Sequence, residues 1–153
     1  TMETRAPDAE YNENDNDDDG EEDALIGLIE AMAAPNQKLS DFQISSLKRV
    51  FSKVWRTHFR KTSIDHVADA LLEHEDIRVK DIGNQLYAFT SKGSYGRFFN
   101  GENNVKFNNQ LTVLELEELK GRKHLQQVVL LQLIYQIQQE MYLGDRSRKK
   151  VVV

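Results

Sequence analysis

The sequence of 153 residues contains no cysteine, which excludes disulfide bonds, thiolate-ligated metals and a cysteine nucleophile from this chain. It also lacks a long apolar stretch, because its longest unbroken run is far shorter than the roughly 20 residues of a membrane-spanning helix. Hydrophobic residues make up 39% and charged residues 29%, which excludes a chain that is disordered throughout. We therefore expect a cytoplasmic protein without a membrane span.

The phosphate-binding motif GxxxxGK(S/T) is absent as well. Lys92 stands before Gly93 and Gly96, whereas the lysine of a phosphate loop follows the glycines. A phosphate loop also needs a strand before it and a helix after it. The residues around Lys92 predict neither in that order. We interpret residues 93–101 as a glycine-hinged loop that aromatic side chains anchor.

The four histidines lie too far apart for the i, i+4 pairing that a helical zinc site uses. They are His58, His66, His74 and His124. Since no cysteine completes a ligand set, we interpret them as surface residues or residues at the edge of the core. The sequence therefore predicts no catalytic residue, no nucleotide-binding residue, no metal site and no cofactor in this chain.

Acidic residues are concentrated at the start of the chain. The net charge is −5, and residues 1–23 hold most of the acidity, with almost no apolar side chain to bury. Such a stretch does not offset the entropy lost on ordering, so we predict an acidic disordered linker over residues 1–23. The alternative is a calcium-binding loop, since carboxylates stand at alternate positions. The glycine and glutamate spacing of an EF-hand is missing, which favours the linker.

Residues 24–100 are predicted to form a helical bundle. Apolar residues recur at helical spacing in four successive segments, and Pro35 closes the first of them. Ser40 and Gln43 form a capping box at the start of the second, and the fourth covers residues 79–90. The predicted core of this bundle contains Leu28, Leu47, Phe51, Val54, Leu71, Ile82 and Leu86.

Residues 101–153 show a different order of elements. An apolar run, Leu111–Leu116, precedes a long helix pattern over Arg122–Leu143, and Lys149–Val153 begins another apolar run. Strand, helix and strand in this order form a βαβ crossover of a parallel sheet. One crossover cannot bury both faces of a sheet, so we expect the chain to be a piece of a larger α/β protein. The predicted fold class is mainly α, a helical bundle insertion with a small βαβ portion.

Four basic residues share one face of the second predicted helix: Arg49, Lys53, Arg56 and Arg60. A basic stripe of this kind contacts a partner or the phosphates of a nucleic acid, or it is the ordinary solvated face of a helix. The pattern favours the solvated face, because charged runs are usually solvated.

Three carboxylates cluster at the C-terminal end of the predicted strand: Glu115, Glu117 and Glu118. Ligands of α/β proteins bind at the carboxyl ends of strands, so acids at this position are candidates for a place near a site. An exposed loop before the last helix explains them equally well, and both interpretations stay open.

Five blocks of the sequence carry a resemblance. They are Glu22-Asp-Ala-Leu-Ile, Leu39-Ser-Asp-Phe-Gln, Gly93-Ser-Tyr-Gly-Arg-Phe-Phe-Asn-Gly, Leu111-Thr-Val-Leu-Glu-Leu-Glu-Glu-Leu and Lys123-His-Leu-Gln-Gln-Val-Val-Leu-Leu. Together they resemble the TraC-type ATPases of F-like conjugation, which are similar to the traffic ATPases of type IV secretion systems. The resemblance covers residues 21–153. In that family a helical insertion separates the phosphate-loop strand from the Walker B strand of a RecA-like domain.

The resemblance implies that this chain corresponds to the insertion and a partial RecA-like segment, with Lys150–Val153 as the start of the Walker B strand. It implies a longer protein that uses ATP and Mg²⁺ for F-pilus assembly or plasmid transfer. That protein is expected to be a homo-oligomer, peripheral at the inner membrane, with other type IV secretion components as partners. No Walker A or Walker B residue has a counterpart here, so this chain alone is not expected to be an enzyme.

Three functions are consistent with these patterns. The first is a non-catalytic portion of a conjugative ATPase, which provides a scaffold and intersubunit or partner contacts. The second is a stand-alone protein-interaction adaptor. The third is a helical nucleic-acid-binding module that uses the basic stripe. The resemblance favours the first function. The run Lys149–Val153, which we interpret as the start of a strand, favours it as well.

Overall fold

The computed structural model describes residues 13–101 and 112–143, and in these ranges the chain is mainly helical. The longer helices are α1 (Glu13–Ala33), α2 (Asp41–His58), α3 (Ile64–Leu72), α4 (Ile77–Gln85) and α6 (Lys123–Leu143). Shorter helical turns are η1 (Phe59–Lys61), η2 (Leu86–Phe89), α5 (Gly96–Phe99) and η3 (Glu117–Leu119). The mainly helical fold class that the sequence predicted is confirmed.

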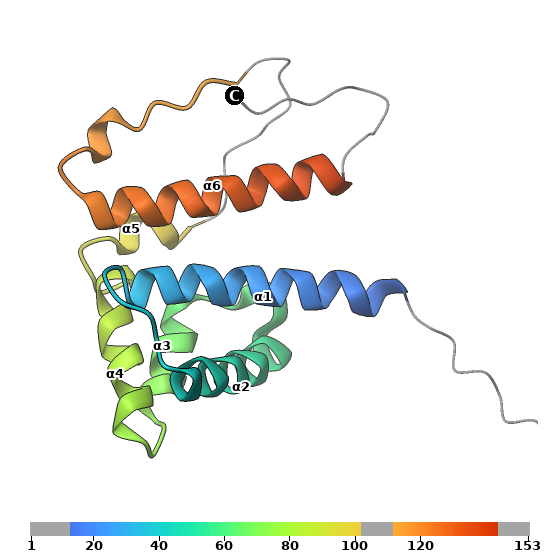
Figure 1. The fold of residues 1–153 in the computed structure, drawn as a ribbon, viewed down its shortest axis with the longest axis vertical. Coiled ribbons are helices and arrows are strands. Elements are labelled where there is room, and N and C mark those ends of the chain that lie inside the picture. Colours follow the sequence, from blue (N-terminus) through green and yellow to red (C-terminus); the bar gives the residue numbers. More distant parts are fainter. Residues whose placement is uncertain (1–12, 102–111, 144–153) are drawn as a thin grey trace, which may run out of the picture.

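Helix α1 lies at the centre of the molecule (Figure 1). Helices α2, α3 and α4 lie on one side of α1, and α6 runs antiparallel to it on the other side. The closest packing joins α3 to α4, while α6 contacts the rest of the fold chiefly through α1. The arrangement is therefore a bundle with one helix laid along its outer edge.

The start of α2 has the capping box that the sequence predicted. The backbone N–H of Ser40 donates to Oε1 of Gln43 at 3.0 Å, and the N–H of Gln43 donates to Oγ of Ser40 at 3.3 Å. A second box, which the sequence analysis missed, begins α3. Here histidine takes the place of the usual glutamate or glutamine. The N–H of Ser63 donates to Nδ1 of His66 at 3.2 Å.

The predicted core is confirmed. All seven residues named from the sequence are buried, and Leu47, Leu71, Ile82 and Leu86 have no exposed surface. The core continues beyond them into η2 and α6, through Phe89, Leu125 and Val128.

The loop between η2 and α5 is closed tightly by glycine. The N–H of Tyr95 donates to the carbonyl oxygen of Ala88 at 2.8 Å, which folds the loop back on η2. A Cβ atom on Gly93 would overlap the carbonyl oxygens of Tyr87 and Ala88. Two aromatic rings, Tyr95 and Phe99, pack against Phe89, each with ring centroids 5.3 Å apart. The predicted glycine-hinged loop therefore has two of its aromatic anchors, whereas Phe98 is 43% exposed and residues 96–99 form α5 instead of irregular loop.

The predicted βαβ portion is not seen in the described part of the chain. Residues 112–116, most of the first predicted strand, have no regular secondary structure. The side chain of Val113 is 73% exposed, because no neighbouring strand pairs with this segment. A strand is stabilised by a partner, so apolar residues alone do not form one. The second predicted strand, residues 149–153, lies outside the described residues.

The start of the chain also differs from the prediction. Helix α1 begins at Glu13, so residues 13–23 are helical where we predicted a disordered linker. Carboxylates in the first turns of a helix interact favourably with its dipole. Contacts with α2 add to this effect, because Lys48 pairs with Asp23 at 2.9 Å and the Ser52 hydroxyl donates to Glu22. Residues 1–12 lie outside the described residues, and the division of the chain into three units stays a prediction.

Candidate contact surfaces

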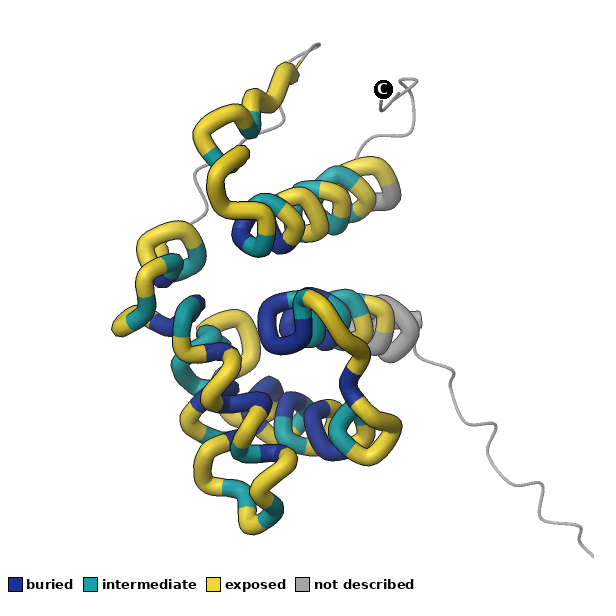
Figure 2. Tube along the Cα trace, turned by 60° about the vertical axis from the view of Figure 1, so that its left-hand side comes forward, coloured by how far each residue is buried: buried dark blue, intermediate teal, exposed yellow. Residues whose placement is uncertain are grey.

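The first two turns of α6 attach it firmly to the bundle. Leu125 and Val128 are fully buried, and the ring of His124 meets Phe89 edge to face with centroids 5.2 Å apart. Nε2 of His124 also lies 3.0 Å from the carbonyl oxygen of Ala31 near the end of α1. A carbonyl oxygen only accepts, so Nε2 carries the hydrogen of this bond. Among the residues of α6 whose burial the structure describes, the buried ones lie in these first turns (Figure 2).

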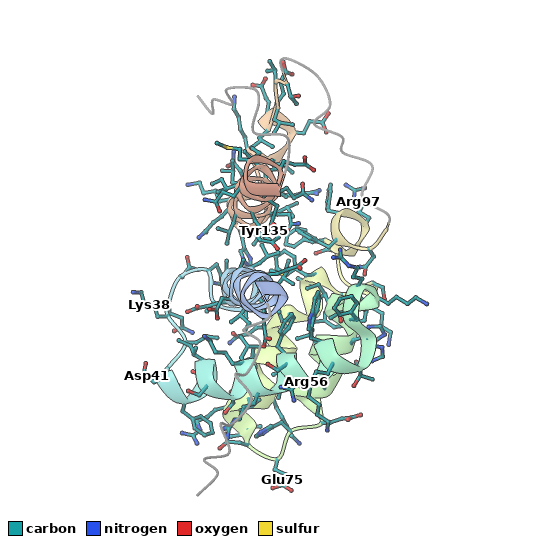
Figure 3. All side chains as sticks on the ribbon, turned by 90° about the vertical axis from the view of Figure 1, so that its right-hand side faces the viewer. Lys38, Asp41, Arg56, Glu75, Arg97 and Tyr135 are labelled. Atoms are coloured by element: carbon teal, nitrogen blue, oxygen red, sulfur yellow. The ribbon has the colours of Figure 1, made fainter. Side chains whose placement is uncertain are left out.

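Beyond Val128 the residues of α6 that face α1 become more polar. Gln132, Tyr135 and Gln139 are partly buried on this side, and Figure 3 shows Tyr135 between the two helices. Burial raises the pKa of the Tyr135 hydroxyl, and the nearby Glu21 carboxylate adds to the effect. A cavity of about 200 Å³ remains in this part of the α1–α6 interface, beside Gly27. The interface is therefore looser here than at the start of α6.

Ile134, which also lines this cavity, belongs to an apolar row along α6. Its residues follow one another at spacings of four, three and four positions, which places them on one helical face: Leu130, Ile134, Ile137 and Met141. We call this row the outer seam. Leu130 is 41% exposed, Ile134 52% and Met141 38%. Ile137 is partly buried, and within the described residues α1 is the main element that covers α6.

The predicted basic stripe is exposed. Arg49, Lys53 and Arg56 lie on α2, whereas Arg60 lies in η1, because α2 ends at His58. None of the four forms an ion pair with another described residue. Nη2 of Arg49 donates to Oγ of Ser46 at 3.3 Å.

The end of α2 has an unusual feature that was not predicted from the sequence. Phe59 has a φ of +48°, the one positive value at a non-glycine position among the described residues. Its ring is 51% exposed and follows Phe51 and Trp55 in a row, with centroid distances of 5.9 and 5.4 Å. The guanidinium of Arg60 lies over this ring, 5.6 Å from its centroid. The i, i+4 spacing of the three aromatic residues was the signal in the sequence that could have indicated the row.

The three carboxylates before α6 are exposed and are not brought to a common site. Glu117 pairs with Lys120, with 2.6 Å between the carboxylate oxygen and Nζ. Glu115 and Glu118 have exposed side chains on either side of it. Residues 112–116 form no strand, so within the described residues the topological reason for a ligand site is missing.

Two further properties concern the described residues only. No group of three or more histidine, aspartate or glutamate side chains is placed so that it holds a metal ion. No helix in these ranges is long and apolar enough to cross a membrane.

Comparison with known proteins identifies a relative. The chain is 28% identical over 137 residues to Protein TraC of Escherichia coli (strain K12). The alignment covers 82% of this chain and 16% of that protein, so the chain spans about one sixth of the length of TraC. No protein-family model and no solved structure matches the chain. The match confirms the resemblance to TraC-type proteins that the sequence blocks indicated.

Proposed function

We propose that this chain is a non-catalytic, mostly helical portion of a TraC-like protein of conjugative type IV secretion. Its role is to provide a scaffold and a contact surface within a longer protein. The similarity to TraC supports the conjugative role, and the uncovered outer seam of α6 supports the contact role.

The outer seam is the observation that carries the proposal. The described residues on this face carry apolar side chains and glutamines, and charged groups are few between Lys123 and Glu140. Burying the exposed parts of Leu130, Ile134, Ile137 and Met141 would stabilise a complex by about 1 kcal/mol for each side chain. Such a surface fits an apolar partner rather than a charged one.

The proposed occupant of the outer seam is the remainder of the longer protein. TraC is about six times as long as the aligned segment, so most of a protein of that kind lies outside this chain. ATP and Mg²⁺ binding, pilus assembly and oligomer formation then belong to the longer protein. We propose the cytoplasm as its location, with a peripheral association at the inner membrane.

The absence of cysteine makes this proposal testable by thiol labelling. Ile134→Cys places one thiol in the outer seam, and the control Glu75→Cys places one at an exposed turn far from α6. Both variants are labelled with a maleimide, in this chain alone and in the protein that the natural gene encodes. Mass spectrometry then measures the modification of each site.

We expect both thiols to react in the isolated chain. In the gene-encoded protein, position 134 should be protected while position 75 still reacts. Equal labelling of position 134 in the two contexts would contradict the proposal.

A further inference from the structure

The end of α2 combines three features that a scaffold does not require. A row of cations is exposed, a large aromatic ring is half exposed beside it, and the backbone of that aromatic residue is strained. These features meet within one turn of the chain, between Arg56 and Arg60.

The cations form a continuous path along α2. Arg49, Lys53 and Arg56 span seven positions, which corresponds to about 10 Å along the helix axis. They are free of ion pairs with other described residues, although acidic residues of α1 lie close by. Those acids contact a neighbouring side of α2, since Asp23 pairs with Lys48 and Glu22 accepts from Ser52. The side chains of the stripe are exposed, which gives an anionic chain access to their charge.

The ring of Phe59 extends this path with a flat apolar surface. The ring of Trp55 packs against the Phe59 ring, with centroids 5.4 Å apart, and the guanidinium of Arg60 lies over the Phe59 ring. Proteins that bind single-stranded nucleic acids combine a cationic path for the phosphates with aromatic rings on which bases stack. An acidic protein segment uses the cations but has no need of the exposed ring.

The strain at Phe59 supports a functional reason for its position. A φ of +48° with a ψ of −125° is unfavourable for a side chain with a Cβ atom. Backbone strain of this kind persists where the surrounding structure enforces it, and it is concentrated at binding sites. At Phe59 the unusual backbone ends α2 and leaves the ring exposed to solvent.

We propose that this surface binds single-stranded nucleic acid without sequence preference. The cations of the basic stripe contact successive phosphates, and Phe59 stacks against an unpaired base. A duplex keeps its bases stacked on one another, so it does not offer a base to the ring. The proposal does not depend on the outer seam of α6.

The first test uses fluorescence anisotropy with the purified chain and a labelled oligothymidine of 20 nucleotides. The triple variant Arg49→Gln, Lys53→Gln, Arg56→Gln is compared with Lys38→Gln, Lys92→Gln, Lys123→Gln, which removes equal charge elsewhere. We expect the native chain to bind more weakly as salt increases. The stripe variant should lower the salt slope by about 2, because each phosphate contact contributes about 0.7. The control variant should retain the native slope.

The second test addresses the ring. Phe59→Leu keeps an apolar side chain of similar size, and Phe59→Tyr keeps the aromatic plane. Loss of one stacked base corresponds to about a 5- to 150-fold weaker affinity. We expect this loss in the leucine variant and near-native binding in the tyrosine variant. Phe59→Gly relieves the backbone strain, so it should weaken binding without lowering the melting temperature.

Three results would overturn the proposal. The first is an affinity for the oligothymidine that is absent or independent of salt. The second is equal binding by the leucine and tyrosine variants. The third is tighter binding of a 20-base-pair duplex, or of an acidic peptide with the sequence of residues 1–23, than of the single strand. Failure of the thiol-labelling experiment would leave this proposal unaffected, because that experiment probes other residues, those of the outer seam of α6.

Discussion

The imidazole of His124 donates a hydrogen bond to the carbonyl oxygen of Ala31. Helix α1 itself has no donor for this oxygen. In a regular helix this oxygen would accept from the N–H of residue 35, four positions later. Residue 35 is proline, which has no N–H. The proline that ends α1 thus leaves an acceptor open, and the first turn of α6 completes it. One bond joins segments that are 93 residues apart in sequence.

Removal of this bond should weaken the attachment of α6. His124→Ala leaves the Ala31 oxygen without its donor and removes the edge contact with Phe89. We expect a loss of about 1–3 kcal/mol in the free energy of unfolding, measured by urea denaturation. His124→Gln keeps a donor and should recover part of the loss. An alanine variant as stable as the native chain would show that the bond contributes nothing.

Substitution of Gly93 should be costly. An added Cβ would overlap the carbonyl oxygens of Tyr87 and Ala88, so the loop has to move away from η2. We expect Gly93→Ala to lower the free energy of unfolding by about 1–3 kcal/mol. Gly27→Ala is the matched control, because its Cβ meets nothing within 4 Å in the interior of α1. It should raise stability by about 0.5–1 kcal/mol. If both variants are equally stable in thermal unfolding, the steric account of Gly93 is wrong.

Acid should remove the contribution of Asp76 to stability. Its side chain accepts hydrogen bonds from the side chain and backbone of Arg78, which lower the pKa of the carboxyl from 3.8 to about 2. A carboxyl whose pKa is lower in the folded state than in the unfolded state stabilises the fold at pH values above the unfolded pKa. This contribution is lost as the pH falls through about 2.

The comparison of the native chain with Asp76→Asn measures this effect. Asparagine still caps α4 but carries no charge. The native chain should have the higher melting temperature near neutral pH, and the difference should narrow between pH 3.8 and about 2. A difference that stays constant over this range would exclude a role for the charge.

The purified chain should not hydrolyse ATP. The glycine loop with its lysine that cradles phosphates is absent from the sequence, so the γ-phosphate has no site of this type. A phosphate-release assay with ATP and Mg²⁺ should give the rate of the buffer alone. Turnover that a substitution within this chain abolishes would contradict the non-catalytic role.

Local signals in the sequence were sufficient for much of the bundle. The capping box of Ser40 and Gln43 begins α2 as predicted, and the apolar spacing identified Leu47 and Ile82 as core residues. These features depend on residues three or four positions apart, which contact one another whenever a helix forms. The helix over 122–143 was also recognised, to within one residue at its start.

Features that depend on distant partners were decided by the tertiary structure. The apolar residues of 112–116 suit a strand, but a strand needs a neighbour, and none of the described segments pairs with it. The contact between His124 and Ala31 joins segments that have no local relation. The sequence also predicted the helix over 122–143, whereas only packing decided that Leu125 is buried and Ile134 exposed. The sequence by itself determined which segments are helices and which residues suit a core. The tertiary structure decided which apolar faces are covered, because burial depends on contacts between segments far apart in the chain.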